Sequence, residues 1–334
     1  MKLRFLLCLA LSLAASAQDK KAVTDEAYRV FRSDGSPATI ADIVAGAKDA
    51  QVVFLGETHD DPVAHHLEAE LWKQLVGPES ILSLEMFETD VQGIVDEYLN
   101  GQITEEHLLS SGRAWRNYKA DYRPLLELAK ERKIPVIAAN APRRYVNRVG
   151  RMGKGSLDSL TAEARRFLPP LPYAEASPEY TEKFNTFMEE MRKEAAKRTP
   201  SSDPAKPAEA KAPPEPPPNP RWQLEAQSLW DASMAFSIAE ALLRSPSARI
   251  VHVNGSFHTE KRLGILDHLS RYRPNTRSLV VTMRADKSFP NWDSERLANA
   301  GDFVIVTDPS LSQPPKAQEA PKQEPRATAP VTGQ

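Results

Sequence analysis

Gln51-Val52-Val53-Phe54-Leu55-Gly56-Glu57-Thr58-His59-Asp60-Asp61-Pro62 is the stretch of sequence that decides the fold. Its apolar, β-branched run from Val52 to Leu55 predicts a strand buried on both faces, as in a parallel sheet. Gly56 allows the backbone to turn, and Asp61 followed by Pro62 is typical of a helix start. The strand therefore brings Glu57 and His59 to its carboxyl end beside a helix N-terminus, where open α/β sheets bind ligands.

Length and composition predict a globular protein with one large core. The chain has 334 residues, of which 41% are apolar. The formal net charge of -2 gives no indication of a nucleic-acid partner. The only cysteine is Cys8, so the chain after the N-terminal segment offers no thiol for a disulfide or a metal. Lipoprotein anchoring through Cys8 fits poorly, because Leu7 before it is not small.

Residues 1–17 have the features of a secretory signal peptide. A basic n-region, an apolar segment too short to span a bilayer and an A-x-A cleavage site follow one another: Lys2 and Arg4, Phe5 to Leu13, and Ala15-Ser16-Ala17. We therefore expect an exported protein, periplasmic or secreted.

Further apolar runs predict five more strands, separated by segments with helical patterning. These runs are residues 81–87, 135–139, 249–253, 278–283 and 302–307. Such alternation predicts an α/β fold with a mostly parallel, layered sheet flanked by helices. Residues 46–308 form this predicted domain, and residues 18–45 form an N-terminal extension with a short hairpin.

The strand-helix alternation is interrupted in the second half of the chain. Residues from about 142 to 245 show only helical patterning, which predicts a helical subdomain that forms a lid over the carboxyl edge of the sheet. Within it, residues from about 199 to 220 are rich in proline, alanine and lysine, and residues 309–334 are rich in proline, glutamine and lysine. Both compositions predict disorder.

Polar residues follow four of the predicted strands at the point where each strand ends. They are Glu57 with His59, Glu85, Asn140, and the Gly255-x-x-His258 motif. Carboxyl ends of parallel strands share one edge of a sheet, so these side chains should converge. Carboxylates and imidazoles in such a group can bind a divalent metal or transfer protons.

Glu85 and His258 have the clearest chemical rationale. A carboxylate in an apolar strand is costly unless it is paired or bound to a cation, although a salt bridge to an arginine would also satisfy it. A helix N-terminus expected beyond His258 favours a neutral imidazole, able to bind metal or act as a base; a loop or capping histidine is the alternative. Glu57, Glu85 and His258 are therefore predicted metal ligands, with His59 as base or additional ligand.

The remaining candidates are less specific. Only one of the adjacent helical histidines His65 and His66 can face the site, and His66 is favoured, with an exposed surface histidine as the alternative. Tyr118 and Tyr122 can line a cofactor pocket or an ordinary core. Arg143, at a helix start, can hold a carboxylate or phosphate, or lie on a solvated surface.

Three familiar motifs are absent from the sequence. It contains no Gly-rich phosphate loop, no G-x-S-x-G turn and no H-E-x-x-H helix. These absences argue against a P-loop NTPase, a serine hydrolase and a zincin.

Several motifs in order resemble the ChaN family of haem-binding uptake lipoproteins. They are Leu55-Gly56-Glu57-Thr58-His59, His65-His66, Ser83-Leu84-Glu85-Met86-Phe87, Asn117 to Leu126, Ala138 to Arg143, Gln227 to Asp231, Met234-Ala235 and Gly255-Ser256-Phe257-His258. The resemblance covers residues from about 45 to 283. Two departures are the missing lipoprotein motif and the Pro-rich insertion.

The resemblance implies an α/β fold with a helical subdomain, and haem or iron binding outside the cytoplasm. It implies a homodimer and an outer-membrane uptake system as partners. His66, Tyr118 and Tyr122 are the candidate axial ligands, and Asn140 and Arg143 are further candidates for cofactor binding. The wider superfamily, with Tiki proteases, TraB proteins and erythromycin esterases, is marked by two glutamates and a G-x-x-H, which match Glu57, Glu85 and the Gly255 to His258 motif.

Three functions remain open at this point. The first is an exported haem-binding protein, which needs an apolar pocket, an axial histidine or tyrosine and cations near the propionates. The second is a metal-dependent peptidase or esterase that activates water at Glu57, Glu85 and His258. The third is an inactive scaffold that binds a partner through its Pro-rich segments. No nucleic-acid partner is expected.

Overall fold

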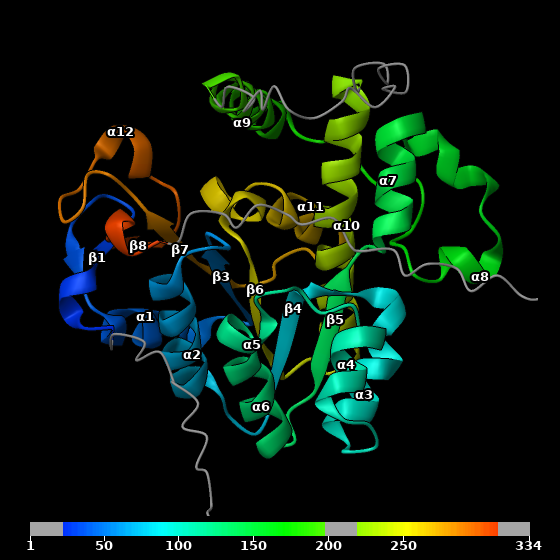
Figure 1. Cartoon of the computed structure of the whole chain (residues 1–334), viewed down its shortest axis with the longest axis horizontal. Coiled ribbons are helices and arrows are strands. Elements are labelled where there is room, and N and C mark those ends of the chain that lie inside the picture. Colours follow the sequence, from blue (N-terminus) through cyan, green and yellow to red (C-terminus); the bar gives the residue numbers. More distant parts are fainter. Residues whose placement is uncertain (1–22, 198–218, 313–334) are drawn as a thin grey trace, which may run out of the picture.

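The computed structural model describes residues 23–197 and 219–312. These residues contain one eight-stranded sheet in the order β2-β1-β8-β7-β3-β6-β4-β5 (Figure 1). The strands are β1 (Tyr28–Arg32), β2 (Pro37–Ala38), β3 (Val52–Glu57), β4 (Ser80–Glu88), β5 (Val136–Asn140), β6 (Arg249–Gly255), β7 (Ser278–Ala285) and β8 (Phe303–Thr307). β3 to β8 pair in parallel, whereas β1 is antiparallel to β8 and β2. The predicted α/β class with a mostly parallel sheet is confirmed.

Helices connect the parallel strands. They are α1 (Ile40–Gly46), α2 (Pro62–Leu75), α3 (Gln92–Leu99), α4 (Glu105–Ser111), α5 (Tyr118–Asp121), α6 (Arg123–Glu131), α7 (Arg143–Met152), α8 (Ala162–Arg165), α9 (Pro178–Lys197), α10 (Pro220–Arg244), α11 (Ile265–Tyr272) and α12 (Ser294–Leu297). Within its described residues, the predicted helical block at 142–245 contains helices and no strand.

Alternate residues of the central strand enter two different cores. Val53 and Leu55 of β3 pack in a cluster with the buried residues of α2, α3 and α6. Val52 and Phe54 pack in a second cluster with α10 and α11. The molecule is therefore a three-layer α/β/α arrangement, and its central strands are continuously apolar because both of their faces are covered.

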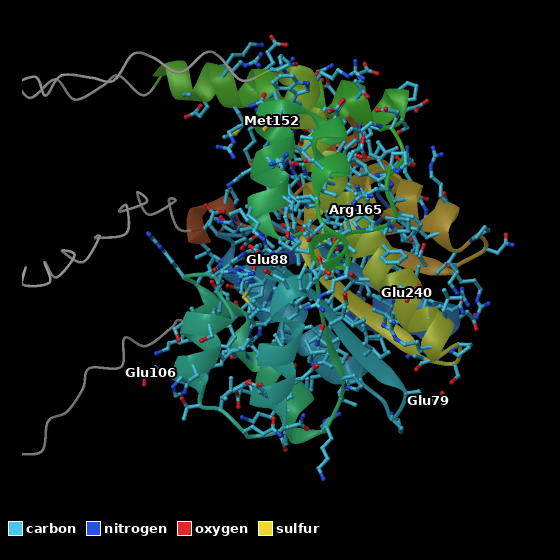
Figure 2. All side chains as sticks on the ribbon, turned by 90° about the vertical axis from the view of Figure 1, so that its right-hand side faces the viewer. Glu79, Glu88, Glu106, Met152, Arg165 and Glu240 are labelled. Carbon is cyan, nitrogen blue, oxygen red and sulfur yellow. The ribbon has the colours of Figure 1, made fainter. Side chains whose placement is uncertain are left out.

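The helical segment lies beyond the carboxyl ends of the strands. In the side view, Glu79 precedes β4, Glu88 ends it, and Met152 of α7 lies further on in the same direction (Figure 2). Two side chains of α9 contact neighbouring elements at this end: Lys183 Nζ donates to the Phe257 carbonyl at 2.6 Å, and the Tyr180 hydroxyl donates to Asp231 of α10. That this segment acts as a lid stays a prediction.

Several sequence predictions concern residues outside the described part. The signal peptide at 1–17, nearly all of the insertion at 199–220, and residues 313–334 of the tail lie there. The hairpin expected in the N-terminal extension is present as β1 and β2. No helix among the described residues combines the length and apolar character needed to cross a membrane.

Candidate functional site

The site lies at the carboxyl ends of β3, β4 and β6. Glu57 is the last residue of β3, and Gly255 is the last residue of β6. The pairing of β4 with β5 shifts register between Leu84 and Glu88, and such irregularities redirect side chains. Glu85 lies in this shifted segment, and its Oε2 accepts a hydrogen bond from the Gly255 N–H at 2.7 Å. The bond connects the rim residues of β4 and β6.

Glu57 is the centre of one acid-imidazole group. Its Oε1 accepts hydrogen bonds from His59 Nδ1, at 2.8 Å, and from the Tyr122 hydroxyl. Burial raises the pKa of Glu57, but hydrogen bonds and charge from His59 and His65 outweigh burial and hold the pKa well below its usual range. Glu57 is therefore an anion at neutral pH.

His59 is the most accessible imidazole of this rim. Its side chain is 48% exposed, although Nδ1 is held by Glu57. The ring packs edge-on against Trp115, with centroids 4.8 Å apart. Burial lowers the pKa of His59, but the hydrogen bond to Glu57 and the charge of Glu85 outweigh burial and raise it above its ordinary value.

His258 lies between two carboxylates from different elements. Its Nδ1 is 2.6 Å from Asp231 Oδ1, and its Nε2 is 3.5 Å from Glu85 Oε1. Burial lowers the pKa of His258, but the charges of Glu85 and Asp231 raise it to about 10. The expectation of a neutral imidazole was wrong, because the two carboxylates outweigh any effect of a helix terminus. The partner of Glu85 is this histidine, and the arginine salt bridge considered from the sequence is not formed in the described chain.

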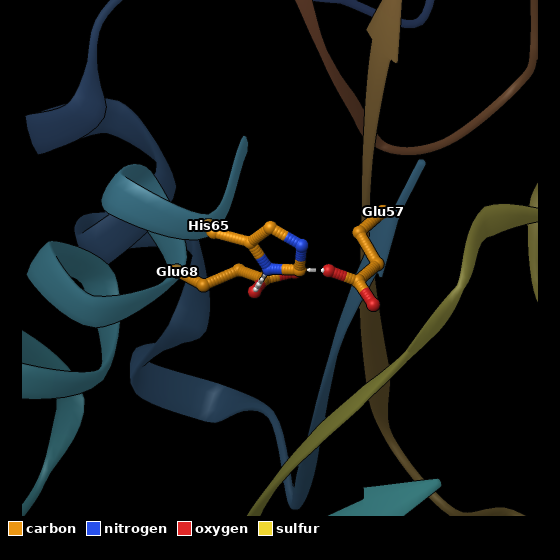
Figure 3. Close-up of side chains that lie close together, drawn as sticks. All are labelled: Glu57, His65 and Glu68. Carbon is orange, nitrogen blue, oxygen red and sulfur yellow. Dashed lines mark hydrogen bonds and ion pairs between the residues drawn. The ribbon is translucent and has the colours of Figure 1, made fainter. Parts of the chain in front are cut away.

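Helix α2 turns His65 toward the site. His65 is buried, with Nδ1 2.7 Å from Glu57 Oε2 and 3.1 Å from Glu68 Oε2, as Figure 3 shows. His66 is exposed. The preference for His66 was wrong: His65 and Glu68 are three residues apart on the face that packs on the sheet, and His66 points away from that face.

Three of the other predicted cofactor residues, Tyr118, Tyr122 and Asn140, are buried. Tyr118 is fully buried in the core, and the Tyr122 hydroxyl is used by Glu57. Asn140 is buried, and its Oδ1 accepts the Ala141 N–H at 2.9 Å. Arg143 is exposed. Their roles in cofactor binding stay predictions.

Sequence reasoning missed two acidic residues as site members. Glu68 lies on α2 one turn after Ala64 and one turn before Leu71, so it belongs to the buried stripe of that helix. Asp231 lies among the buried residues of α10. A carboxylate inside an otherwise apolar helical stripe was the available signal in both cases.

Fold and rim together define the class of the protein: a three-layer α/β protein with buried acid-imidazole groups at the carboxyl edge of its sheet. The chain belongs to the family described as haem-binding uptake, Tiki superfamily, ChaN, which matches residues 43–269. The resemblance identified from sequence motifs is thus confirmed.

The solved structure of ChaN of Campylobacter jejuni, described as showing cofacial haem binding, has a similar fold. It is 17% identical, with a TM-score of 0.58, over 85% of this chain and 98% of that one. An erythromycin esterase, EreC, in its open conformation is 13% identical, with a TM-score of 0.41, over 84% of this chain and 83% of that one. No curated protein matches the chain.

Proposed function

We propose that the protein binds haem and serves haem or iron uptake outside the cytoplasm. Its family is one of haem-binding uptake proteins, and the related Campylobacter protein is described as binding haem. The observation that carries the proposal is His59, a half-exposed imidazole whose Nδ1 is fixed by a buried carboxylate.

The surroundings of His59 fit an axial ligand of haem iron. Histidines that bind metals usually donate their other ring N–H to a carboxylate or carbonyl, which orients the ring. Glu57 does this for Nδ1, so Nε2 is the nitrogen left for iron. A Cβ atom at Gly255 would lie 2.9 Å from that Nε2, so a glycine at this position leaves room for the His59 ring. Trp115 supplies an apolar surface beside the ring.

The axial candidates favoured from sequence fit less well. The Tyr122 hydroxyl already donates to Glu57, and burial raises the pKa of Tyr122 well above its ordinary value, which disfavours the phenolate that iron prefers. Tyr118 is also wholly buried. His66 is accessible, but it lies on the side of α2 away from the rim. Bound haem would supply a redox-active iron, and His59 would hold it.

A haem titration followed by absorbance tests the proposal. We expect a saturable Soret shift for the wild-type chain, and a loss of at least tenfold in affinity for His59→Ala. His66→Ala is the matched control, since it removes a neighbouring exposed imidazole, and its titration should match the wild type. A wild-type titration without saturation contradicts haem binding, and an unchanged His59→Ala titration contradicts the ligand assignment.

Export, delivery to an outer-membrane uptake system and a homodimer are further parts of the proposal. The signal-peptide features of residues 1–17 support export, and fractionation of producing cells tests it. The metal-dependent hydrolase alternative is favoured less, because the matching family is described as one of haem-binding uptake proteins.

A further inference from the structure

Three ionisable side chains meet between β3 and α2, on the side of Glu57 away from His59. Glu57, His65 and Glu68 each offer one ligand atom, and these atoms lie within 4.8 Å of one another. All three residues are buried. Figure 3 shows both carboxylates directed at the His65 ring. Among the described residues, this is the group of acidic and imidazole side chains whose spacing would suit a metal ion.

The second nitrogen of His65 determines how the ring is protonated. Nε2 lies 3.1 Å from the backbone carbonyl of His59. A carbonyl oxygen only accepts hydrogen bonds, so Nε2 carries a hydrogen. In the neutral ring, the lone pair of Nδ1 therefore faces two carboxylates. This arrangement is repulsive unless a positive charge, a proton or a metal ion, lies at Nδ1.

One carboxylate oxygen of the cluster is also unsatisfied. Glu68 Oε1 is buried and has no hydrogen-bond partner in the described chain, whereas Glu57 Oε2 has His65 Nδ1 as a partner when that nitrogen carries a proton. A buried carboxylate oxygen without a donor is costly. A cation bound between the three side chains would satisfy this oxygen and the Nδ1 atom together.

We propose that Glu57, His65 and Glu68 bind a divalent transition metal ion of the zinc type. Two carboxylates and one imidazole are a donor set used for zinc, and the hydrogen bond from Nε2 to a carbonyl is the outer contact that metal-binding histidines usually make. An imidazole ligand favours zinc over magnesium or calcium, which prefer oxygen alone.

This site differs from the haem position and from the ligand set predicted from sequence. Glu57 is shared, but Oε1 accepts from His59 and Tyr122 while Oε2 faces His65. Glu85 and His258 take no part. A metal ion here would hold α2 against β3 and fix the carboxylate that orients His59.

Zinc titration of the metal-free, full-length protein tests the site. We expect one equivalent of Zn²⁺ to bind with release of protons, and Mg²⁺ not to compete. Glu68→Gln should weaken zinc binding at least tenfold. Glu70→Gln, a change of the same kind on the same helix, is the matched control and should bind zinc like the wild type. Zinc should also raise the Tm of the wild type and of the control, but not of Glu68→Gln.

The outcomes separate this proposal from haem binding. The Soret titration of metal-free Glu68→Gln should equal that of the metal-free wild type, because Glu68 does not contact His59. A folded wild-type protein that binds no zinc, or a Glu68→Gln variant that binds it as tightly, overturns the metal site. Loss of zinc on Glu85→Gln but not on Glu68→Gln also overturns it and places the metal at the other end of the rim.

Discussion

The charge of His258 depends on two carboxylates that approach it from β4 and α10. The folded pKa of His258 is about 10, above its ordinary 6.5. The stability that the charged His258 contributes to the fold is therefore complete below pH 6.5 and is lost as the pH rises through 10. Burial raises the pKa of Glu85, but mainly the His258 charge lowers it to about 2, below its ordinary 4.5. That contribution is complete above pH 4.5 and is lost as the pH falls toward 2. The pair therefore stabilises the fold most between pH 4.5 and 6.5.

His258→Gln should show this dependence directly. Removing one partner of a buried ion pair costs about 3–5 kcal/mol, so we expect a loss of this size in the free energy of unfolding at pH 6. The difference from the wild type should shrink as the pH rises toward 10, because the wild type then loses the same charge. Urea unfolding of both proteins at pH 6, 8 and 9.5 measures the difference. A difference that stays constant with pH would contradict a charged His258.

The start of α2 is the element on which both proposed sites depend. Asp61 is its N-cap, and its Oδ1 accepts the Val63 N–H at 2.9 Å and the Ala64 N–H at 3.3 Å. Its Oδ2 accepts the Thr307 hydroxyl at the end of β8. One buried carboxylate therefore caps the helix that carries His65 and also connects that helix to the sheet.

Asp61→Ala should destabilise the protein by about 2 kcal/mol, the upper range for loss of an N-cap, because the Thr307 hydroxyl also loses its acceptor. Asp61→Asn should cost less than half as much, since its amide oxygen still caps the helix and its NH₂ can face Thr307. Thermal and urea unfolding of the two variants show which substitution costs more stability. Equal losses would mean that the charge of Asp61, rather than its capping geometry, stabilises the helix.

At the scale of the whole molecule, α10 joins the sheet to the helical segment. Ile238 and Leu242 lie in the core against the central strands. Leu229, toward the other end of the same helix, lies in the core formed with Val146 and Val149 of α7. A single continuous helix thus takes part in both cores, which predicts that they unfold together.

Leu229→Ala should lower the free energy of unfolding by about 2–5 kcal/mol, because Leu229 is fully buried and its truncation leaves a cavity. The unfolding transitions followed by far-ultraviolet circular dichroism and by tryptophan fluorescence should shift by the same amount. Leu243→Ala is the matched control, since Leu243 is 62% exposed on the same helix, and it should change stability by less than about 0.5 kcal/mol. Two separate transitions, with only one moved by Leu229→Ala, would contradict coupled unfolding.

The strands and most helix positions could be predicted from local sequence. Apolar runs such as Val52 to Leu55 can only be buried on both faces, and the Asp61-Pro62 pair starts a helix through its own backbone chemistry. Residues at strand ends, such as Glu57 and Glu85, could be assigned to one rim because parallel strands share an edge. Family membership followed from the same motifs in order.

The tertiary structure alone decided which side chains meet. The direction of a helical residue is defined relative to its own helix, so only the packing of α2 showed that His65 and Glu68, rather than His66, face Glu57. Asp231 reaches His258 across 27 positions of sequence, and this contact reverses the charge expected for the imidazole. Burial and charge act through space, so the ionisation of the site depends on neighbours that no local pattern identifies.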